Sequence, residues 1–206
     1  PPVEGTLVSI LIPFRDQVRL SQTCVQSIQS KAGTTIPYEI ILIDNGSQGE
    51  DTRAWIDSVQ NEKIRCLRID SPFNFSRLNN IASRHSNGDY LLFLNNDIEF
   101  QSHNVLDQLM EPFAFHKTGA VGSRLHYPDG TIQHSGVMIV TGERRCVQEP
   151  GKHLGEASVI QSLTPLMQQE EYSAASAACL MVKKESFDAI GGFDEQLEVV
   201  FNDVDL

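Results

Sequence analysis

Three short polar segments each follow directly after a run of apolar residues, and they carry the side chains best suited to chemistry. The segments are Pro13-Phe14-Arg15-Asp16, Asp44-Asn45-Gly46-Ser47 and Asn95-Asn96-Asp97. In an open α/β sheet, ligands bind in the crevice beyond the carboxyl ends of the strands. If the apolar runs are strands of one such sheet, Asp44 and Asp97 lie at the same edge, and we expect a ligand site there.

Glycine-rich phosphate loops are missing from the sequence. No Gly-x-Gly-x-x-Gly follows the first apolar run and no Gly-Lys-Ser/Thr is present, which disfavours a dinucleotide-binding Rossmann domain and excludes a P-loop. The motifs Gly-x-Ser-x-Gly and His-Glu-x-x-His are missing as well. A chain with a formal charge of −11 that binds a diphosphate needs a divalent cation, because bare carboxylates would repel the ligand.

The first half of the chain alternates between short apolar runs and stretches with apolar residues at helical spacing. Strands are expected at 7–12, 39–43, 64–69 and 90–94, and helices around 20–28, 55–59, 78–85 and 105–113. Asp16 is suited to cap the first helix, and Asn74 or Ser76 the third. This order predicts an α/β fold with parallel strands and right-handed crossovers, enclosed between helices.

The second half has a different pattern, with shorter apolar runs and a long polar stretch. The expected elements are a hairpin formed by 120–127 and 131–140 around Pro128-Asp129-Gly130, an irregular loop at 141–170, a strand at 177–182 and a helix at 183–190. No linker that would separate domains is visible. We therefore predict a single domain over 1–206, with a nucleotide-binding half at 1–115 and an appended half at 116–206.

Composition narrows the class of protein. The 206 residues are 40% hydrophobic, which is typical of a globular chain. Lys and Arg number 16 against 27 Asp and Glu, without any basic run, so no nucleic-acid partner is expected. No apolar run is long enough to cross a bilayer. Cys24 and Cys179 lie in apolar-periodic stretches and are predicted to be small buried hydrophobes, which favours a reducing compartment and a cytoplasmic protein.

Six blocks of residues occur in a familiar order, at 8–16, 43–47, 74–80, 88–97, 191–195 and 202–206. With them the chain resembles the family 2 glycosyltransferases of the GT-A fold, the bacterial polysaccharide type often labelled rhamnosyl- or N-acetylhexosaminyl-transferase. The resemblance covers nearly the whole chain. It implies a three-layer α/β/α fold, in which a Rossmann-like half with a mostly parallel sheet carries appended mixed strands and acceptor-side loops.

The resemblance also implies a binding site for a nucleotide-sugar donor. The residues implied to hold the nucleoside or the diphosphate are Pro13, Phe14, Arg15, Asp44, Asn74 and Arg77. Among them, Asp44 would accept a hydrogen bond from the base, whereas Asn74 and Arg77 would lie against the base and the diphosphate. The implied donor is a UDP- or dTDP-sugar, and the implied acceptor is a growing glycan or a lipid-linked acceptor.

Two further positions are implied to serve the reaction itself. Asn95-Asn96-Asp97 occupies the place of the family's Asp-x-Asp motif, so Asp97 would ligate Mg²⁺ or Mn²⁺, with Asn95 at the ribose and Asn96 in the same donor-binding loop. Asp203 would be the general base that takes the proton from the acceptor hydroxyl, in a single in-line displacement that inverts the anomeric centre. The metal would offset charge that builds on the departing nucleoside diphosphate.

The chain departs from the family pattern at two positions. Asn95 replaces the first motif carboxylate, which leaves Asp97 nearly alone as a protein ligand; Mg²⁺ tolerates this, because it commonly binds through one or two carboxylates plus phosphates and waters. Asn202 replaces the acidic neighbour of the expected base. Family members continue beyond Leu206, so we expect the chain to be a fragment of a protein that associates peripherally with the inner face of the membrane.

Plainer interpretations exist for most of these residues. Asp44 suits a turn, Asn74 a helix cap, and Arg77 a solvated helix surface. His134 is predicted to be an ordinary strand residue in preference to an acceptor contact, and a helical aspartate such as Asp203 usually faces solvent. Two other classes of function stay open: a non-catalytic domain that binds nucleotide sugars or glycans, and a sugar-nucleotidyltransferase, although the segment after the first strand lacks the glycines of the latter.

Overall fold

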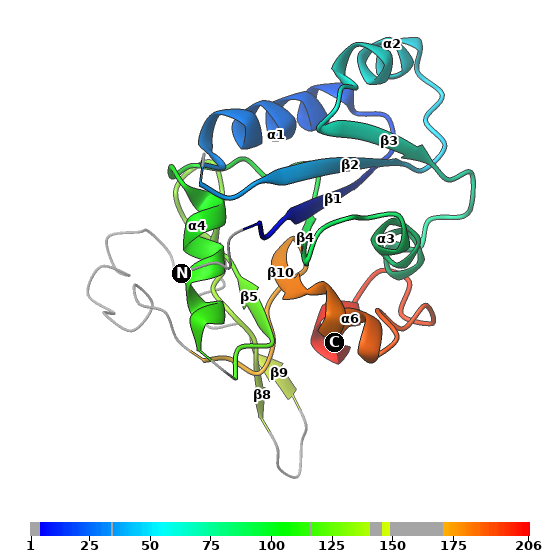
Figure 1. The fold of residues 1–206 in the computed structure, drawn as a ribbon. Coiled ribbons are helices and arrows are strands. Elements are labelled where there is room, and N and C mark those ends of the chain that lie inside the picture. Colours follow the sequence, from blue (N-terminus) through cyan, green and yellow to red (C-terminus); the bar gives the residue numbers. More distant parts are fainter. Residues whose placement is uncertain (1–4, 34, 116, 141–145, 149–170) are drawn as a thin grey trace.

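The protein is built around one central sheet of six strands (Figure 1). The computed structural model describes residues 5–33, 35–115, 117–140, 146–148 and 171–206. The strands of the sheet are β1 (Val8–Phe14), β2 (Tyr38–Asp44), β3 (Ile64–Arg68), β4 (Tyr90–Leu94), β5 (Ala120–Gly122) and β10 (Cys179–Lys183). Their order is β3-β2-β1-β4-β10-β5. The first four run parallel, and β10 runs antiparallel to both of its neighbours.

Helices cover both faces of the sheet, as the alternating pattern predicts. They are α1 (Val18–Lys31), α2 (Glu50–Val59), α3 (Phe75–Arg84), α4 (Val105–Met110), the 3₁₀ turn Glu111–Ala114, α6 (Lys184–Ala189) and α7 (Asn202–Asp205). Alternate residues of the strands divide the core in two: one set packs on α1, α2 and α4, and the other on α3 and α6. The three-layer α/β/α fold is therefore confirmed.

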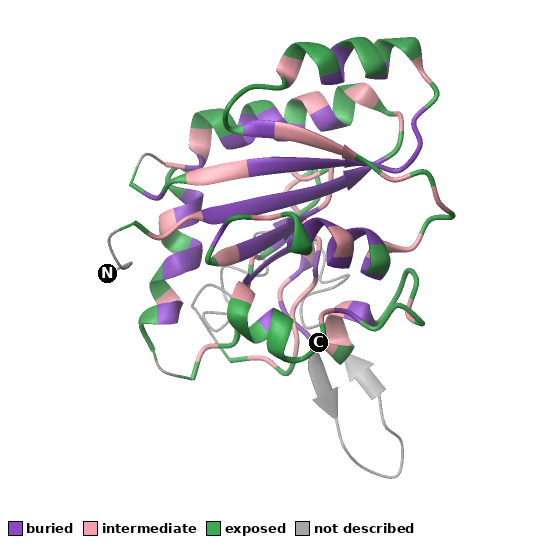
Figure 2. Ribbon diagram, turned by 45° about the vertical axis from the view of Figure 1, so that its right-hand side comes forward, coloured by how far each residue is buried: buried purple, intermediate pink, exposed green. Residues whose placement is uncertain are grey.

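Strands β1, β2 and β4 are buried over most of their length (Figure 2), which explains their continuous apolar sequences. The edge strand β3 is buried only at Ile64. All seven residues of β1 are buried. Cys24 and Cys179 are also buried, at 1% and 2% exposure, as predicted for small hydrophobic residues. Burial raises the pKa of the Cys24 thiol to about 12, so this sulfur is a packing group and not a nucleophile.

The predicted hairpin is correct only at its turn. The short strands β6 (Leu125–His126) and β7 (Ile132–His134) pair antiparallel there. The segment at the start of the expected hairpin is instead strand β5 and joins the central sheet beside β10. The other arm is interrupted at Gly136, whose φ of +114° and tight packing on the Tyr172 ring exclude a side chain.

A second small pair of strands lies partly inside the expected irregular loop. Strand β8 (Met138–Val140) pairs antiparallel with β9 (Cys146–Gln148), so the prediction of 141–170 as loop is wrong at 146–148. The rest of that segment, 141–145 and 149–170, lies outside the described residues. Both halves of the chain contribute strands to the central sheet, and the division at 115/116 stays a prediction.

Asp16 does not cap the first helix. The N-cap of α1 is Gln17, which has a left-handed φ of 48° and makes no side-chain cap hydrogen bond. The Asp16 carboxylate accepts the backbone N–H groups of Gln48 and Gly49 instead, at 2.9 and 3.0 Å. These two bonds lower the pKa of Asp16 below its usual value. Asp16 therefore joins the loop after β1 to the loop after β2.

Across the described ranges, every helix is too short or too polar to span a bilayer.

Candidate functional site

The three polar segments at the ends of β1, β2 and β4 leave the sheet at the same edge. Phe14, the last residue of β1, pairs in register with Asp44, the last residue of β2. Leu11 pairs with Phe93, so β4 ends beside the end of β1. Backbone bonds hold the loops together, because Asn45 donates its N–H to Phe14 at 2.9 Å. The predicted meeting of these segments is thus seen in the register of the strands.

Asp44 lies inside this edge. Its side chain is only 2% exposed, and its carboxylate already has two partners in the chain. Oδ1 accepts the backbone N–H of Ser47 at 2.8 Å, and Oδ2 accepts Nη1 of Arg68 at 2.8 Å. The hydrogen bond of Asp44 to a base stays a prediction, while its role in the turn is directly visible.

Arg68 is a residue of this edge that the sequence reasoning missed. It is the last residue of β3 and pairs in register with Asp44. Besides Asp44, its guanidinium donates to both carboxylate oxygens of Asp70, at 3.1 and 3.0 Å, and to the carbonyl of Ser47 at 3.1 Å. The signal in the sequence is weak, since a lone arginine at the end of a strand is usually an ordinary surface cation.

The loop after β4 carries an unpaired carboxylate. Asn95 donates its N–H to the carbonyl of Ala178 at 3.0 Å, and its own carbonyl accepts Ile98 at 3.2 Å, which closes a turn. Asn96 donates Nδ2 to the Ser21 hydroxyl at 3.1 Å. Asp97 is exposed, and within the described residues its carboxylate has no hydrogen-bond or ion-pair partner. It is therefore free to bind a ligand.

Asp203 lies close to the same loop through the segment that precedes β10. Oδ2 of Asp203 accepts the backbone N–H of Ala177 at 3.1 Å. The next residue, Ala178, accepts the N–H of Asn95. Two consecutive residues therefore connect the loop of Asp97 to Asp203, the predicted base.

His134 binds Ser176, which directly precedes Ala177 and Ala178 in the same segment. His134 is 5% exposed, and Nε2 accepts the backbone N–H groups of Gly136 and Ser176, at 3.2 and 3.1 Å. Nε2 can accept these bonds only when it carries no proton. His134 is thus a buried structural residue of β7, in line with the plainer of the two interpretations.

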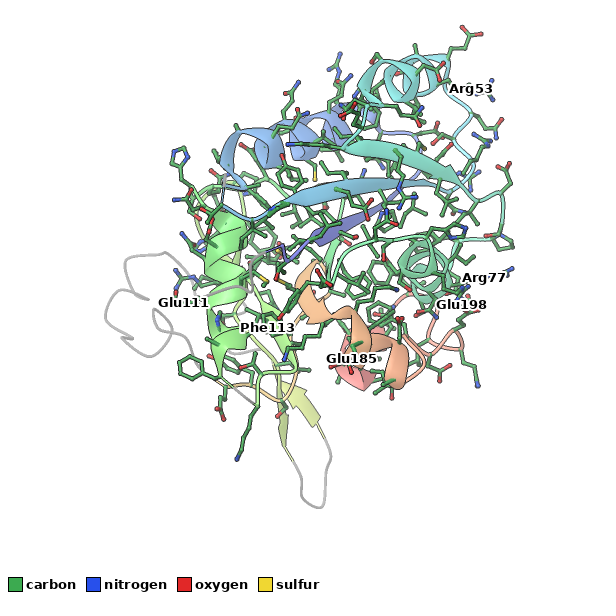
Figure 3. All side chains as sticks on the ribbon, viewed as in Figure 1. Arg53, Arg77, Glu111, Phe113, Glu185 and Glu198 are labelled. Carbon is green, nitrogen blue, oxygen red and sulfur yellow. The ribbon has the colours of Figure 1, made fainter. Side chains whose placement is uncertain are left out.

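Asn74 begins α3 as a cap and also anchors the C-terminal loop. Its Oδ1 accepts the N–H of Arg77 at 2.8 Å, which confirms the capping prediction, and its Nδ2 donates to the carbonyl of Glu195 at 2.8 Å. Arg77 projects outward from α3 on the side of Glu198 (Figure 3) and is exposed. The guanidinium is available to a ligand, whereas the Asn74 amide is occupied by the chain itself.

The residues at the end of β1 and directly after it divide between core and surface. Pro13 and Phe14 are buried, and the Phe14 ring packs edge-to-face on Trp55 with centroids 5.9 Å apart. Only the backbone of these two residues is at the edge. Arg15 is exposed. An open hollow of about 580 Å³ lies next to it, between the starts of α1 and α2, and is lined by residues 16–20, Gly49, Asp51 and Thr52.

A divalent cation fits the side chains at this edge only if one carboxylate, that of Asp97, is its protein ligand. The described ranges contain no group of three or more His, Cys, Asp or Glu side chains that could form a closed metal site. Asp97 offers a single exposed carboxylate, which suits Mg²⁺ or Mn²⁺ that takes its remaining ligands from phosphates and waters. Any metal held at Asp97 would therefore need phosphate or water oxygens to complete its coordination.

Comparison with known proteins identifies relatives of this chain. The model of "Glycosyl transferase family 2" matches residues 9–191. Protein y4gI of Sinorhizobium fredii is 40% identical over 215 residues, covering 100% of this chain and 23% of that protein. The O-antigen biosynthesis protein RfbC of Myxococcus xanthus is 34% identical over 207 residues, covering 100% of this chain and 16% of its own length. The chain thus spans less than a quarter of these relatives.

A solved glycosyltransferase structure shares this fold. Mannosyltransferase PcManGT from Pyrobaculum calidifontis, in complex with GDP-Man and Mn²⁺, superimposes with a TM-score of 0.65. The match covers 96% of this chain and 49% of that one, at 15% sequence identity. At this identity the likeness establishes the fold.

Proposed function

The chain belongs to glycosyl transferase family 2, and on this basis we propose that it transfers a sugar from a nucleoside-diphosphate sugar to a glycan or a lipid-linked acceptor. The proposed donor is a UDP- or dTDP-sugar. The relative named for O-antigen biosynthesis supports an acceptor of the polysaccharide type. The mannosyltransferase of the same fold, whose complex holds GDP-Man and Mn²⁺, supports a nucleotide sugar with a divalent metal.

The observation that carries the proposal is the position of Asp97. This exposed carboxylate follows β4 at the edge where β1 and β2 also end. It has no partner among the described residues, whereas the Asn95 backbone and the Asn96 amide in the same loop are hydrogen-bonded. A charged group left unpaired beside bonded neighbours is what a site for a metal and a diphosphate requires.

Each residue has a proposed task at this edge. Asp97 holds Mg²⁺ or Mn²⁺, which when bound neutralises charge on the leaving diphosphate. The loop 13–15 and the turn of Asp44 border the nucleoside, with Asn95 at the ribose and Asn96 holding their loop on α1. Asn74 and Arg77 lie at the start of α3, beside the base and the diphosphate. The Arg77 guanidinium is the group of the two that is available to bind them.

Asp203 is the proposed general base. The hydrogen bond from Ala177 leaves Oδ1 and the second lone pair of Oδ2 for the acceptor hydroxyl. As that hydroxyl attacks the anomeric carbon, its proton passes to the carboxylate, and the bond to the nucleoside diphosphate breaks on the opposite face. The proposed outcome is inversion at the anomeric carbon.

A non-catalytic domain that binds nucleotide sugars is the second candidate. Asn95 and Asn202 favour it, because both stand where the family motif has a carboxylate. Asn202 is 4% exposed and donates Nδ2 to the carbonyl of Leu197 at 3.4 Å, so this amide serves the loop.

Release of nucleoside diphosphate separates the two candidates. The full-length protein, incubated with Mn²⁺, UDP- or dTDP-sugars and lipid-linked acceptors, should release the diphosphate and extend the acceptor. Mass spectrometry of the acceptor identifies the sugar. Tight Mn²⁺-dependent binding of the donor without any release would favour the binding domain and contradict transfer.

A further inference from the structure

Arg68 joins two turns at the nucleoside end of the proposed site. It lies at the carboxyl end of β3, opposite Asp44 in the sheet register. One arm of its guanidinium, Nη1, donates to Asp44 Oδ2 and to the Ser47 carbonyl in the turn after β2. The remaining nitrogens donate to both carboxylate oxygens of Asp70, beyond β3. The two turns are therefore fixed relative to each other by one side chain.

A second residue makes the same connection in the opposite direction. Asn45, directly after Asp44, donates Nδ2 to the carbonyls of Ile69 and Ser71, at 3.0 and 2.9 Å. Asn45 is 1% exposed, so this half of the connection is out of reach of a ligand. The Arg68 side chain, in contrast, is 39% exposed and forms the outer surface of the connection.

The bonds of Arg68 leave it little capacity to bind phosphate. Four hydrogen bonds occupy four of the five N–H groups that a guanidinium carries. The carboxylates of Asp44 and Asp70 also place negative charge on both sides of it. Its task in the chain is therefore to hold carboxylates and not to bind a diphosphate.

Without Arg68, the Asp44 carboxylate would be buried with a single backbone donor. Removing one partner of a buried ion pair leaves the other charge uncompensated, and the carboxylate is then no longer held in its present position. Building on the proposed function, we propose that Arg68 is a positioning residue for the nucleoside: it holds the Asp44 carboxylate in place and fixes the turn of residues 44–47 against which the base lies.

The test compares ligands with and without a nucleoside. Calorimetry with Mn²⁺ and UDP, dTDP or GDP should show about a tenfold or greater loss of affinity in Arg68→Ala, because one charge-assisted hydrogen bond is worth about that factor. Affinity for Mn²⁺ with inorganic pyrophosphate should stay within about twofold of the wild type. Arg68→Lys, which keeps the cation but not the fork of donors, should lose less than Arg68→Ala.

Arg65 provides the matched control. It lies on the same strand, pairs with Glu39 at 3.3 Å at the opposite edge of the sheet, and is similarly exposed. Arg65→Ala should bind every ligand as the wild type does, and thermal melting shows whether each variant is folded.

Three outcomes would overturn the inference. A folded Arg68→Ala protein whose affinity for nucleoside diphosphates equals that of the wild type removes the positioning role. Equal losses for UDP and pyrophosphate would make Arg68 a phosphate ligand instead. If the wild type binds none of the three nucleoside diphosphates, the proposed function fails, and the inference fails with it.

Discussion

The backbone N–H of Ala177 donates to Oδ2 of Asp203, and this bond of 3.1 Å places the proposed base beside the start of β10. Because β10 runs antiparallel to β4, its start lies at the end of β4, where Asp97 follows. The same segment contacts His134 through Ser176 and Asn95 through Ala178. Three consecutive residues thus bring the acceptor side and the metal side of the proposed site together.

Replacing Asp203 with Asn should separate binding from transfer. The amide oxygen can still accept the Ala177 N–H, so the loop and donor binding should be kept. The amide cannot take up a proton, so transfer in the full-length protein should fall by about 100-fold or more. Steady-state kinetics together with calorimetry for the donor checks both halves. Normal turnover in Asp203→Asn would remove this residue as the base.

Asn80 should be essential for the stability of the C-terminal loop. It is 5% exposed, donates Nδ2 to the Phe193 carbonyl and accepts the Phe193 N–H through Oδ1, both at 2.9 Å. Asn80→Ala leaves these two backbone groups without their partner, which should cost about 2–4 kcal/mol in the free energy of unfolding. Urea denaturation measures this loss.

The control for Asn80 is Arg84→Ala, an exposed position on the same helix. It should change the free energy of unfolding by less than about 0.5 kcal/mol. If Asn80→Ala and Arg84→Ala unfold at the same urea concentration, the bonds between α3 and the loop contribute nothing measurable.

Glu39 should make the stability of the fold sensitive to acid. Burial raises the pKa of this carboxyl, but hydrogen bonds from Ser9 and Asn87 and the charge of Arg65 outweigh burial and lower it overall. The folded protein then binds the proton more weakly than the unfolded chain. The contribution of Glu39 is therefore complete above the pKa of an unfolded glutamate and is lost as the pH falls through the folded-state pKa.

Comparison with Glu39→Gln isolates this effect. The wild type should be the more stable of the two at pH 7, and the difference in the free energy of unfolding should shrink as the pH falls below about 4.3. Urea titrations at a series of pH values measure it. A difference that stays constant down to pH 2 would show that the Glu39 charge does not contribute to stability.

The parallel part of the fold was predictable because its information is local. A strand buried on both faces needs a continuous apolar run, and the runs ending near Ile12, Ile43 and Leu94 show it directly. The pairing of β5 with β10 was missed, because residues 120–122 and 180–182 meet only through contacts distant in the chain. The hairpin prediction kept the neighbouring segments together, as short connections usually do.

The site was predictable as a set of loops but not as a set of contacts. The polar residues after each strand identify the edge, and the register confirms that they share it. Which group is occupied and which is free depends on partners elsewhere: Asp16 binds the next loop, Asp44 is held by Arg68, and Asp97 is left open. No spacing in the sequence distinguishes these three carboxylates.

Mn²⁺-dependent binding of nucleoside diphosphates to Asp97→Ala tests the central claim most directly. Calorimetry with UDP and dTDP should show that the wild type binds at least one of them tightly with Mn²⁺ and weakly without it. Asp57→Ala, an exposed aspartate on α2, should behave as the wild type. In Asp97→Ala the metal-dependent part of the affinity should disappear. Unchanged Mn²⁺-dependent affinity in folded Asp97→Ala would contradict the account.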